Sequence, residues 1–443
     1  MRIVVLHAGG LGDLVLVETL LGALRERHPQ ARVELACRAD VAPVVTLYAR
    51  PPDAVHTFEF NPYRWAVPDE SVALQAQTLL PKLRGENVDL FVAAELRATW
   101  LSEILASALA PRIAVIADAR KPRPNELLIL LGKLRLERNG AVRRLPAIAM
   151  EHELDRYARL AGTPVRRVPA LRPAPSGAAS GELMVFPFGA SSIQQWPIAA
   201  MGEAALLIAR RRGARIVLVG CAAQRGEADA SVAAGIFGEA PQLMFCEPAQ
   251  LPAVAARIAA AAGYLGIDTG LVHLAAAYGV PGAAVFGGGT WPSYAPWAPR
   301  SAGVVAPIPC FGCEWDCAFG RPFCLEGVHA ESVAAAFEDV CENDDGKPLV
   351  RSLDPYSARE KAIFEAATAV HRAAQDDRGA RFAAITRLRD LFVRFARRTR
   401  AGTRRADTAL AELADTTART ARRLDSWEVN ARLHAAGRRP DEQ

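Results

Sequence analysis

Short apolar runs alternate with longer amphipathic stretches through the first part of the chain. Strand-length runs occupy Ile3 to Leu6, Arg32 to Cys37, Leu90 to Ala93 and Ile113 to Ile116. A helix is predicted over Asp13 to Arg27, where leucines recur three and four positions apart. Strands that alternate with helices favour a parallel sheet with helices on both faces.

The same alternation returns after a break. Residues 171–182 lie in a stretch rich in Pro, Ala, Ser and Gly, which predicts a linker. Five further strands are expected at Leu183–Phe186, Arg215–Val219, Gln242–Phe245, Tyr264–Ile267 and Ala283–Phe286. Helices are expected at Ala199–Arg211 and Leu251–Ala262. The pattern predicts an α/β protein with two Rossmann-like, parallel-sheet domains at 1–170 and 183–345 that face a cleft.

The pattern changes again near the C-terminal end of the sequence. Residues 350–443 have only helical periodicity, with wide spacing of leucines after Ala401, which is too sparse for a clear coiled coil. We expect a helical extension that packs on the body or pairs subunits in a homo-oligomer.

Charge is placed unevenly along the 443 residues. From residue 351 onward 20 Lys and Arg stand against 13 Asp and Glu, a net charge of +7, whereas the whole chain carries +5. A basic arm can contact anionic lipid, a phosphorylated glycan or nucleic acid, but a solvated helix face is the commoner explanation. No run approaches the ~20 apolar residues that span a bilayer. We expect a cytoplasmic protein, peripheral on the inner membrane if the arm binds lipid, and no nucleic-acid partner.

The richest chemistry lies between residues 267 and 290. A strand ends at Ile267, Asp268-Thr269-Gly270 follow, and a short helix begins at once. Ligands of open parallel sheets bind where strand C-termini meet helix N-termini, and a helix N-terminus attracts phosphate. Asp268 and Thr269 are candidate caps, and His273 lies one turn further on. Taken alone, this is also an ordinary N-cap and a core histidine.

The whole string, D-T-G-L-V-H-L-A-A-A-Y-G-V-P followed by F-G, resembles the nucleotide-sugar loop of glycosyltransferase family 9, the ADP-heptose heptosyltransferases. The resemblance covers roughly residues 1–340. It implies a GT-B fold, an ADP-sugar donor bound by Asp268, Thr269, Gly270 and His273, and no catalytic metal. The sequence agrees on the last point, since no Asp-x-Asp pair stands beside the expected diphosphate site.

A glycine turn follows the first predicted strand. Gly9-Gly10-Leu11-Gly12-Asp13 is similar to the G-x-L-G-D segment of the family, which implies Gly10 and Gly12 on the acceptor side and Asp13 as general base. Asp13 is also a natural N-cap for a helix that starts at Leu14. A dinucleotide-binding turn matches poorly, because the G-x-G-x-x-G spacing is missing and Glu34 lies inside the next strand.

A second loop, residues 188–197, resembles the P-G-A-x…K-x-W-P segment of the family. By resemblance, Ser191, Ser192 and Gln194 contact the diphosphate. Gln194 stands where the family has Lys, so the usual cationic partner is missing there. Gln224 and Glu227 are candidate ribose contacts after the next strand.

Four cysteines fall within fifteen positions, in a Cys-rich loop at 310–324. Cys310, Cys313, Cys317 and Cys324 follow C-x2-C-x3-C-x6-C spacing, which in a cytosolic protein favours metal before disulfide. We expect a structural iron or zinc site, because four thiolates leave no open position. Reduced cysteines without metal are the alternative. The autotransporter-type heptosyltransferases, which the loop resembles, hold iron on four cysteines.

These patterns predict an inverting glycosyltransferase that moves a heptose or similar sugar from an ADP-sugar to a glycan, lipid-linked glycan or protein acceptor. Two alternatives stay open. One is another nucleotide-sugar enzyme on the same fold, such as an epimerase, which needs no acceptor. The other is a catalytically degenerate scaffold protein. The replacement of the family Lys by Gln194 and the basic arm favour this alternative. Turnover of an ADP-sugar separates them.

Overall fold

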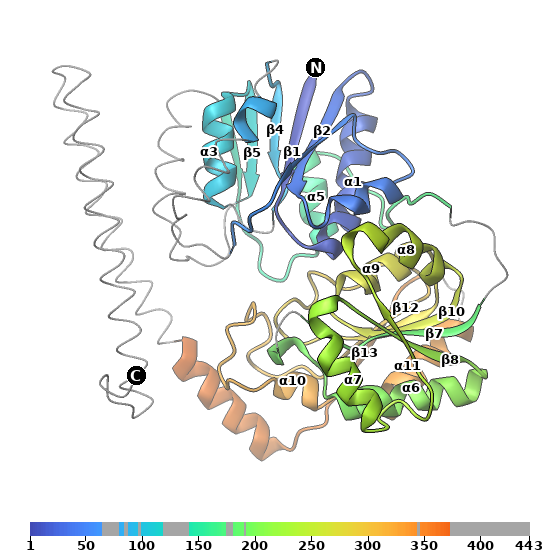
Figure 1. Ribbon diagram of the computed structural model, residues 1–443. Helices are drawn as coiled ribbons and strands as arrows, with labels where there is room; N and C mark the ends of the chain where they lie inside the picture. Colours follow the sequence, from blue (N-terminus) through green and yellow to red (C-terminus); the bar gives the residue numbers. More distant parts are fainter. Residues whose placement is uncertain are drawn as a thin grey trace, which may run out of the picture.

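Two parallel β-sheets organise the chain (Figure 1). The structure, a computed structural model, describes residues 1–63, 79–83, 87–95, 99–117, 141–173, 180–189, 192–342 and 346–372. Each sheet belongs to one domain, and all ladders between the described strands of a sheet are parallel. The α/β, two-domain architecture predicted from the sequence is confirmed.

The N-terminal domain holds a sheet of strand order β3-β2-β1-β4-β5-β6. Its elements are β1 (Arg2–His7), α1 (Leu11–Arg27), β2 (Arg32–Arg38), the 3-10 helix η1 (Ala42–Leu47), β3 (Ala54–Phe58), β4 (Leu90–Ala93), α3 (Trp100–Leu109), β5 (Ile113–Ala117), β6 (Ala141–Leu145) and α5 (Glu153–Ala161). Alternate residues of β1 enter different cores: Ile3 and Val5 pack with α1, and Val4 and Leu6 with α3. The period of two along a strand therefore covers both faces of the sheet.

The C-terminal domain holds a sheet of order β13-β12-β11-β10-β7-β8-β9. Its elements are β7 (Ser180–Phe186), η2 (Ser192–Gln194), α6 (Ile198–Arg212), β8 (Arg215–Gly220), η3 (Ala222–Gln224), α7 (Arg225–Ala233), β9 (Gln242–Phe245), η4 (Pro248–Gln250), α8 (Leu251–Ala259), β10 (Ala261–Ile267), α9 (Gly270–Ala277), β11 (Gly282–Val285), β12 (Ser301–Val305), α10 (Phe323–Glu326), α11 (Ala330–Glu342) and β13 (Leu349–Ser352). A last described helix covers 358–372.

Both sheets reverse their strand order once, and these switch points define where a ligand site can form. In the first sheet the reversal lies between β1 and β4, and in the second between β7 and β10. Loops that leave the carboxyl ends of two such neighbouring strands run to opposite faces of the sheet. A crevice opens between these loops. The turn at Gly9–Gly12 follows β1, and Asp268 follows β10. The topology therefore places both sequence motifs at switch points.

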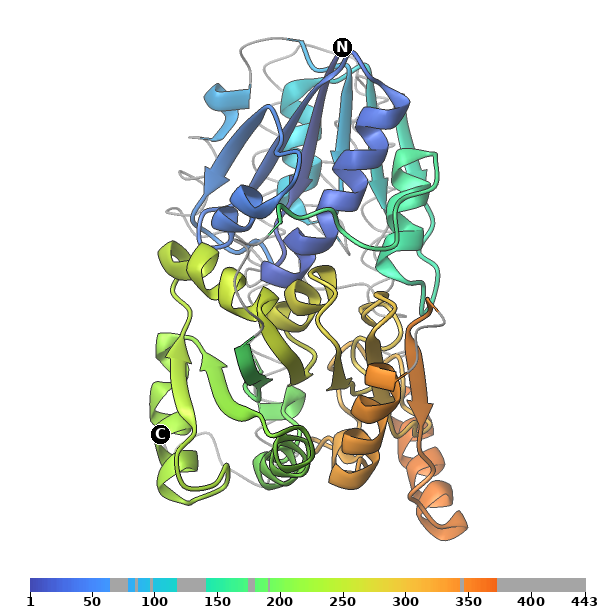
Figure 2. The ribbon, with the colours of Figure 1, turned by 90° about the vertical axis from the view of Figure 1, so that its right-hand side faces the viewer.

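The two domains share one apolar core. Buried residues of α1, including Leu14 and Val15, belong to the same cluster as Val254 of α8 and Val272 of α9. Figures 1 and 2 show α1 in the upper domain and α8 and α9 at the top of the lower one, next to each other in both views. Burial of apolar side chains between the domains thus stabilises the arrangement that brings the two switch points together.

The strand predictions agree with the structure to within three residues at every end. Strand β7 begins at Ser180, inside the segment assigned to the linker, and β10 begins three residues before Tyr264. The remainder of the linker, 174–179, lies outside the described residues. The helical extension predicted from residue 350 begins later, because β13 (Leu349–Ser352) still belongs to the C-terminal sheet. Its part beyond residue 372 also lies outside the described residues, so its predicted roles stay predictions. None of the helices within the described ranges is both long and apolar enough to cross a lipid bilayer.

Helix α1 begins earlier than the sequence suggested. Its N-cap is Gly10 and its first residue Leu11, so Asp13 is the third residue of the helix and not the cap of a helix from Leu14. The prediction of Asp13 as N-cap was wrong. The extended backbone of Gly10 starts the helix, and the carboxylate reaches back to it from within the first turn.

Glu34 is a structural carboxylate. It is 1% exposed within β2, and its oxygens accept hydrogen bonds from the Arg2 guanidinium at 3.0 and 2.8 Å. Although burial opposes ionisation, Arg2 and His56 lower the pKa of Glu34 to about 2. A dinucleotide-binding acidic residue must face the ribose at the end of its strand. The ion pair therefore removes Glu34 from that role.

Candidate functional site

Asp13 lies at the interface between the domains and is held from both sides. Its Oδ2 accepts the backbone N–H of Gly10 at 2.7 Å. Its Oδ1 accepts the hydroxyl of Tyr294, a residue of the C-terminal domain, at 2.8 Å. Two donors fix the plane of the carboxylate, and one of them belongs to the other domain.

The surroundings of Asp13 make it a stronger base than a free carboxylate. Burial raises the pKa of Asp13 above its ordinary value, while the hydrogen bonds from Tyr294 and Gly10 lower it in part. The net direction is upward. A carboxylate whose pKa is moved toward neutrality removes a hydroxyl proton more effectively.

Helix α9 presents its N-terminus to the same place. Its N-cap is Thr269, but by backbone only: no side-chain cap is formed, contrary to the expectation for Asp268 and Thr269. Asp268 instead accepts the hydroxyl of Thr290. The Thr269 hydroxyl oxygen is buried and makes no hydrogen bond to the part of the chain that is described. An unsatisfied hydroxyl beside the free N–H groups of a helix N-terminus is suited to an anion.

Asp268 and Asp13 influence each other across the interface. Burial, together with the Asp13 charge, raises the pKa of Asp268 to about 6, although the hydrogen bond from Thr290 lowers it in part. Two carboxyl groups that repel each other in a partly dry site do not both ionise readily. Both are therefore sensitive to any charge that enters between them.

Two glycines allow the domains to meet. A Cβ added to Gly12 would stand 2.7 Å from Cδ2 of His273 and 2.9 Å from Cα of Gly270. A Cβ on Gly270 would stand 2.6 Å from the Gly12 nitrogen. The N-termini of α1 and α9 therefore meet at these two glycines, with the side chains of Leu11 and His273 packed beside them. Gly12, assigned to the acceptor side, lies directly against donor-side residues.

His273 is buried on α9, with 5% exposure. Burial lowers its pKa to about 4, so the imidazole is neutral at physiological pH. Its ring meets that of Tyr294 edge-on, with centroids 6.2 Å apart. His273 thus shapes the wall between the two glycines and Tyr294.

The loop after β7 contributes backbone groups and the side chain of Gln194, which stands where the resembled family has Lys. Gly189 packs on Gln194, since a Cβ there would lie 3.2 Å from the Gln194 Cβ. The Gly189 carbonyl accepts the Gln224 amide at 3.4 Å. Ser191 lies outside the described residues, and Ser192 is described only as the first residue of η2. The contacts expected of these two serines remain predictions.

The predicted ribose contacts lie just beyond β8. Gln224 also accepts the Cys221 N–H at 2.9 Å and so joins the end of β8 to the loop after β7. Glu227 contacts Gln195, not Gln224, at 3.4 Å. Gln224 therefore bridges the two donor-side segments, while Glu227 borders them.

The Cys-rich loop contains four free thiols. Cys310 and Cys324 are buried, and burial together with the neighbouring cysteines raises their pKa values to about 12 and about 11. Within the described ranges, no three side chains of His, Cys, Asp or Glu are gathered in a way that could hold a metal ion. In this arrangement the four cysteines do not fit the expected tetrahedral site.

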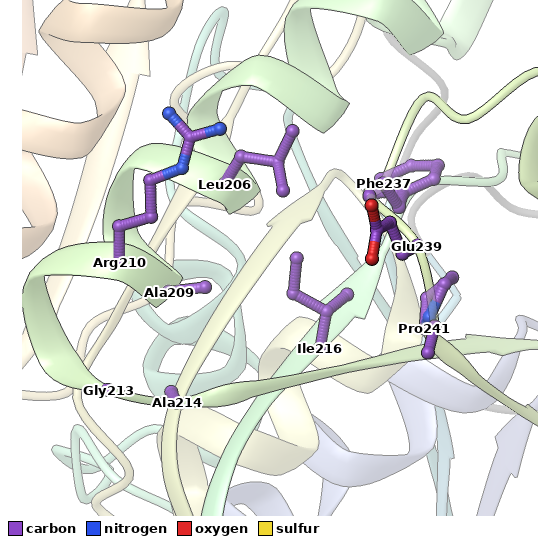
Figure 3. A pocket seen from close by; sticks show the side chains of 11 residues that line it. Leu206, Ala209, Arg210, Gly213, Ala214, Ile216, Phe237, Glu239 and Pro241 are labelled. Carbon is purple, nitrogen blue, oxygen red and sulfur yellow. The ribbon is translucent and has the colours of Figure 1, made fainter.

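A hollow of about 300 Å³ lies elsewhere on the C-terminal domain (Figure 3). Arg210 near the end of α6, Ile216 near the start of β8 and Glu239 border it. These positions are at the amino end of the strands, opposite the edge where Asp268 lies. The hollow is separate from the candidate site.

Two site residues were missed in the sequence: Thr290 and Tyr294. Both lie on the loop after β11, the strand next to β10. That loop leaves the same sheet edge as Asp268. Its position at this edge is the one sequence signal that could have pointed to Thr290 and Tyr294. The contact of this loop with the N-terminal domain depends on how the domains dock, which no local sequence pattern reveals.

Comparison with solved structures agrees with the two-domain fold. A glycosyltransferase family 9 structure from Veillonella parvula DSM 2008 superposes with a TM-score of 0.59 at 16% identity, over 77% of this chain and 97% of that one. ADP-heptose lps heptosyltransferase II of E. coli gives 0.58 at 18%, over 77% and 98%. E. coli heptosyltransferase WaaC, solved with ADP-2-deoxy-2-fluoro heptose, gives 0.50 at 19%, over 69% and 94%. No curated protein sequence matches the chain.

Two parallel-sheet domains that meet at their switch points define the GT-B class of fold, as the sequence predicted. Residues 152–316 match the model of glycosyltransferase family 9 (heptosyltransferase). The resemblance to this family is thereby confirmed over these residues. The match includes α9, Asp268 and Tyr294, while Asp13 precedes it.

Proposed function

We propose that the protein is an inverting glycosyltransferase that transfers a heptose or similar sugar from an ADP-sugar to a hydroxyl of a glycan, lipid-linked glycan or protein. The observation that carries the proposal is the contact of Gly12 with Gly270. It sets a carboxylate of raised pKa, Asp13, beside the N-terminus of a helix on the other domain. Transfer needs both groups: a base for the acceptor and a site for the departing diphosphate.

In the proposed reaction Asp13 accepts the proton of the acceptor hydroxyl as its oxygen attacks the anomeric carbon. The bond to the diphosphate breaks on the opposite face, through an oxocarbenium-like state, and ADP leaves. The charge that develops on ADP is stabilised by the N–H groups at the start of α9 and by the unpartnered Thr269 hydroxyl. These groups support the leaving group where Gln194 replaces the usual Lys of the family.

The proposed donor is tested by calorimetric titration of the purified chain with ADP, UDP and GDP. We expect ADP to bind at least about tenfold more tightly than the others, equivalent to about 1.4 kcal/mol. A preference for UDP contradicts the proposed donor. Absence of binding to all three contradicts a transferase and favours the scaffold alternative.

The Cys-rich loop is tested separately. If its cysteines close on a structural iron or zinc, the purified protein carries about one metal ion per chain by elemental analysis. Cys313→Ser combined with Cys317→Ser then removes the metal and lowers the unfolding temperature, because binding free energy of a structural metal adds to folding. Cys341→Ser, outside the loop, is the control. Metal-free wild-type protein contradicts the site.

A further inference from the structure

We propose that Tyr294, a residue of the donor-side domain, is the positioning residue that sets the Asp13 carboxylate for proton transfer, so that the base is complete only when the domains are closed. The inference rests on the proposed function, since it concerns the base of that reaction. It adds a residue that lies 281 positions from the base in the sequence.

Hydrogen bonding to Asp13 leaves room for the acceptor. Tyr294 and the Gly10 N–H each take up one of its two oxygens. A carboxylate oxygen accepts two hydrogen bonds, so each retains one lone pair for an acceptor hydroxyl. Without Tyr294, Oδ1 has no hydrogen-bond donor among the described residues, and the carboxylate is held at Oδ2 alone. The phenol therefore orients the lone pair that the acceptor meets.

The turn that carries Tyr294 is also held at the donor site. The backbone N–H of Tyr294 donates to the Thr290 carbonyl at 3.2 Å, so both residues share one turn. The Thr290 hydroxyl donates to Asp268, at the N-terminus of α9. One turn of chain thus contacts both carboxyl groups, one on each side of the interface. Residues 290–294 therefore link Asp268 on one side of the interface to Asp13 on the other.

The two residues that flank Tyr294 anchor this turn to the N-terminal domain. The Ser293 carbonyl accepts the N–H of Glu153 at 2.9 Å, at the start of α5. The Ala295 carbonyl is 3.0 Å from Nε2 of His152. Since Nδ1 of His152 accepts the Leu154 N–H, Nε2 carries the proton and donates to Ala295. Helix α5 packs on α1, so Tyr294 is fixed against the helix that bears the base.

The charges around Asp13 keep the phenol in the donor role. Burial, together with the Asp13 charge, raises the pKa of Tyr294 above its ordinary value, so it stays protonated. The other groups that face this pair come from several elements: Arg156 and Tyr157 of α5, His7 at the end of β1, Arg38 at the end of β2, Glu153 of α5, Asp268 after β10 and His273 of α9. Arg156 and Arg38 favour the ionised form of Asp13, as Tyr294 does.

Tyr294→Phe tests the proposal, because it keeps the ring and removes the hydroxyl. Loss of a hydrogen bond to the ionised form raises the Asp13 pKa, so the acidic limb of the kcat/KM profile moves to higher pH by about one pH unit. We expect kcat to fall about tenfold and the Kd of ADP to stay unchanged. Tyr278→Phe, which removes a phenol hydroxyl at the end of α9, leaves the profile in place.

A second measurement does not depend on transfer. In protein labelled with 13C at the Asp carboxyls, the Asp13 signal is assigned by its absence in Asp13→Asn and titrated with pH. In Tyr294→Phe we expect its midpoint to rise. An unchanged midpoint, or a fall in kcat without movement of the acidic limb, overturns the role of Tyr294. A wild-type protein that transfers no sugar from an ADP-sugar contradicts the proposed function, whichever way the midpoint moves.

Discussion

Asp13→Asn is expected to lower kcat by about 10²- to 10⁴-fold, the usual contribution of a positioned general base. The amide is nearly isosteric with the carboxylate and still accepts one hydrogen bond, from Gly10 or from Tyr294, which hold the native side chain. It cannot take the acceptor proton. The measurement is sugar transfer from the ADP-sugar under single-turnover conditions, which isolates chemistry from product release.

Donor binding and fold serve as the controls for this variant. Because Asp13 belongs to the N-terminal domain, the Kd of ADP should change little, and removal of a like charge from the neighbourhood of Asp268 should tighten it if anything. The Asp268 pKa, about 6 in the native protein, is expected to fall in the variant, since the Asp13 charge is one of the causes that raise it. Transfer at the wild-type rate would falsify the assignment of Asp13 as base.

Gly12→Ala is expected to reduce kcat/KM by about 10²-fold, since displacement of reacting groups by about 1 Å commonly costs that much. The added Cβ would stand 2.9 Å from the Gly270 Cα, and backbone cannot move aside as a flexible side chain does. The domains must separate slightly, which moves the N-terminus of α9 away from Asp13. Helix α1 itself does not suffer, because alanine favours a helix interior over glycine by about 0.5–1 kcal/mol.

The matched control is Gly226→Ala, in the first turn of α7. Nothing lies within 4 Å of a Cβ at that position, so transfer and the unfolding temperature should match those of the wild type. Small-angle scattering on Gly12→Ala measures the separation directly and should give a larger radius of gyration. Full activity in Gly12→Ala means that the two glycines need not touch in the reactive arrangement.

The local part of the site could be predicted from the sequence. Periods of two and of three to four along the chain set the order of strands and helices, and glycines mark where β1 turns into α1. Asp13 and Asp268 therefore appear at the carboxyl ends of strands before any tertiary contact is known. The sequence predicted two domains that face a cleft, whereas the electrostatic interaction of Asp13 with Asp268 follows from how the domains dock.

The exact start of each helix at the site was decided by competition among possible capping groups. The sequence offered Asp13, Asp268 and Thr269 as caps, but α1 starts at Gly10 and Asp268 binds Thr290. A cap is chosen by which donor reaches a side chain in three dimensions, and several residue types satisfy the local pattern equally well. Sequence spacing locates such a helix end to within a few residues.

The sequence by itself determined the two-sheet architecture and the loops in which the chemistry lies, because hydrophobic periodicity and glycine turns act over a few residues. Only the tertiary structure decided that Tyr294 meets Asp13 and that Gly12 meets Gly270. Both contacts depend on the apolar surfaces of α1, α8 and α9 burying each other. That docking is a property of whole surfaces, and no stretch of sequence near either partner encodes it.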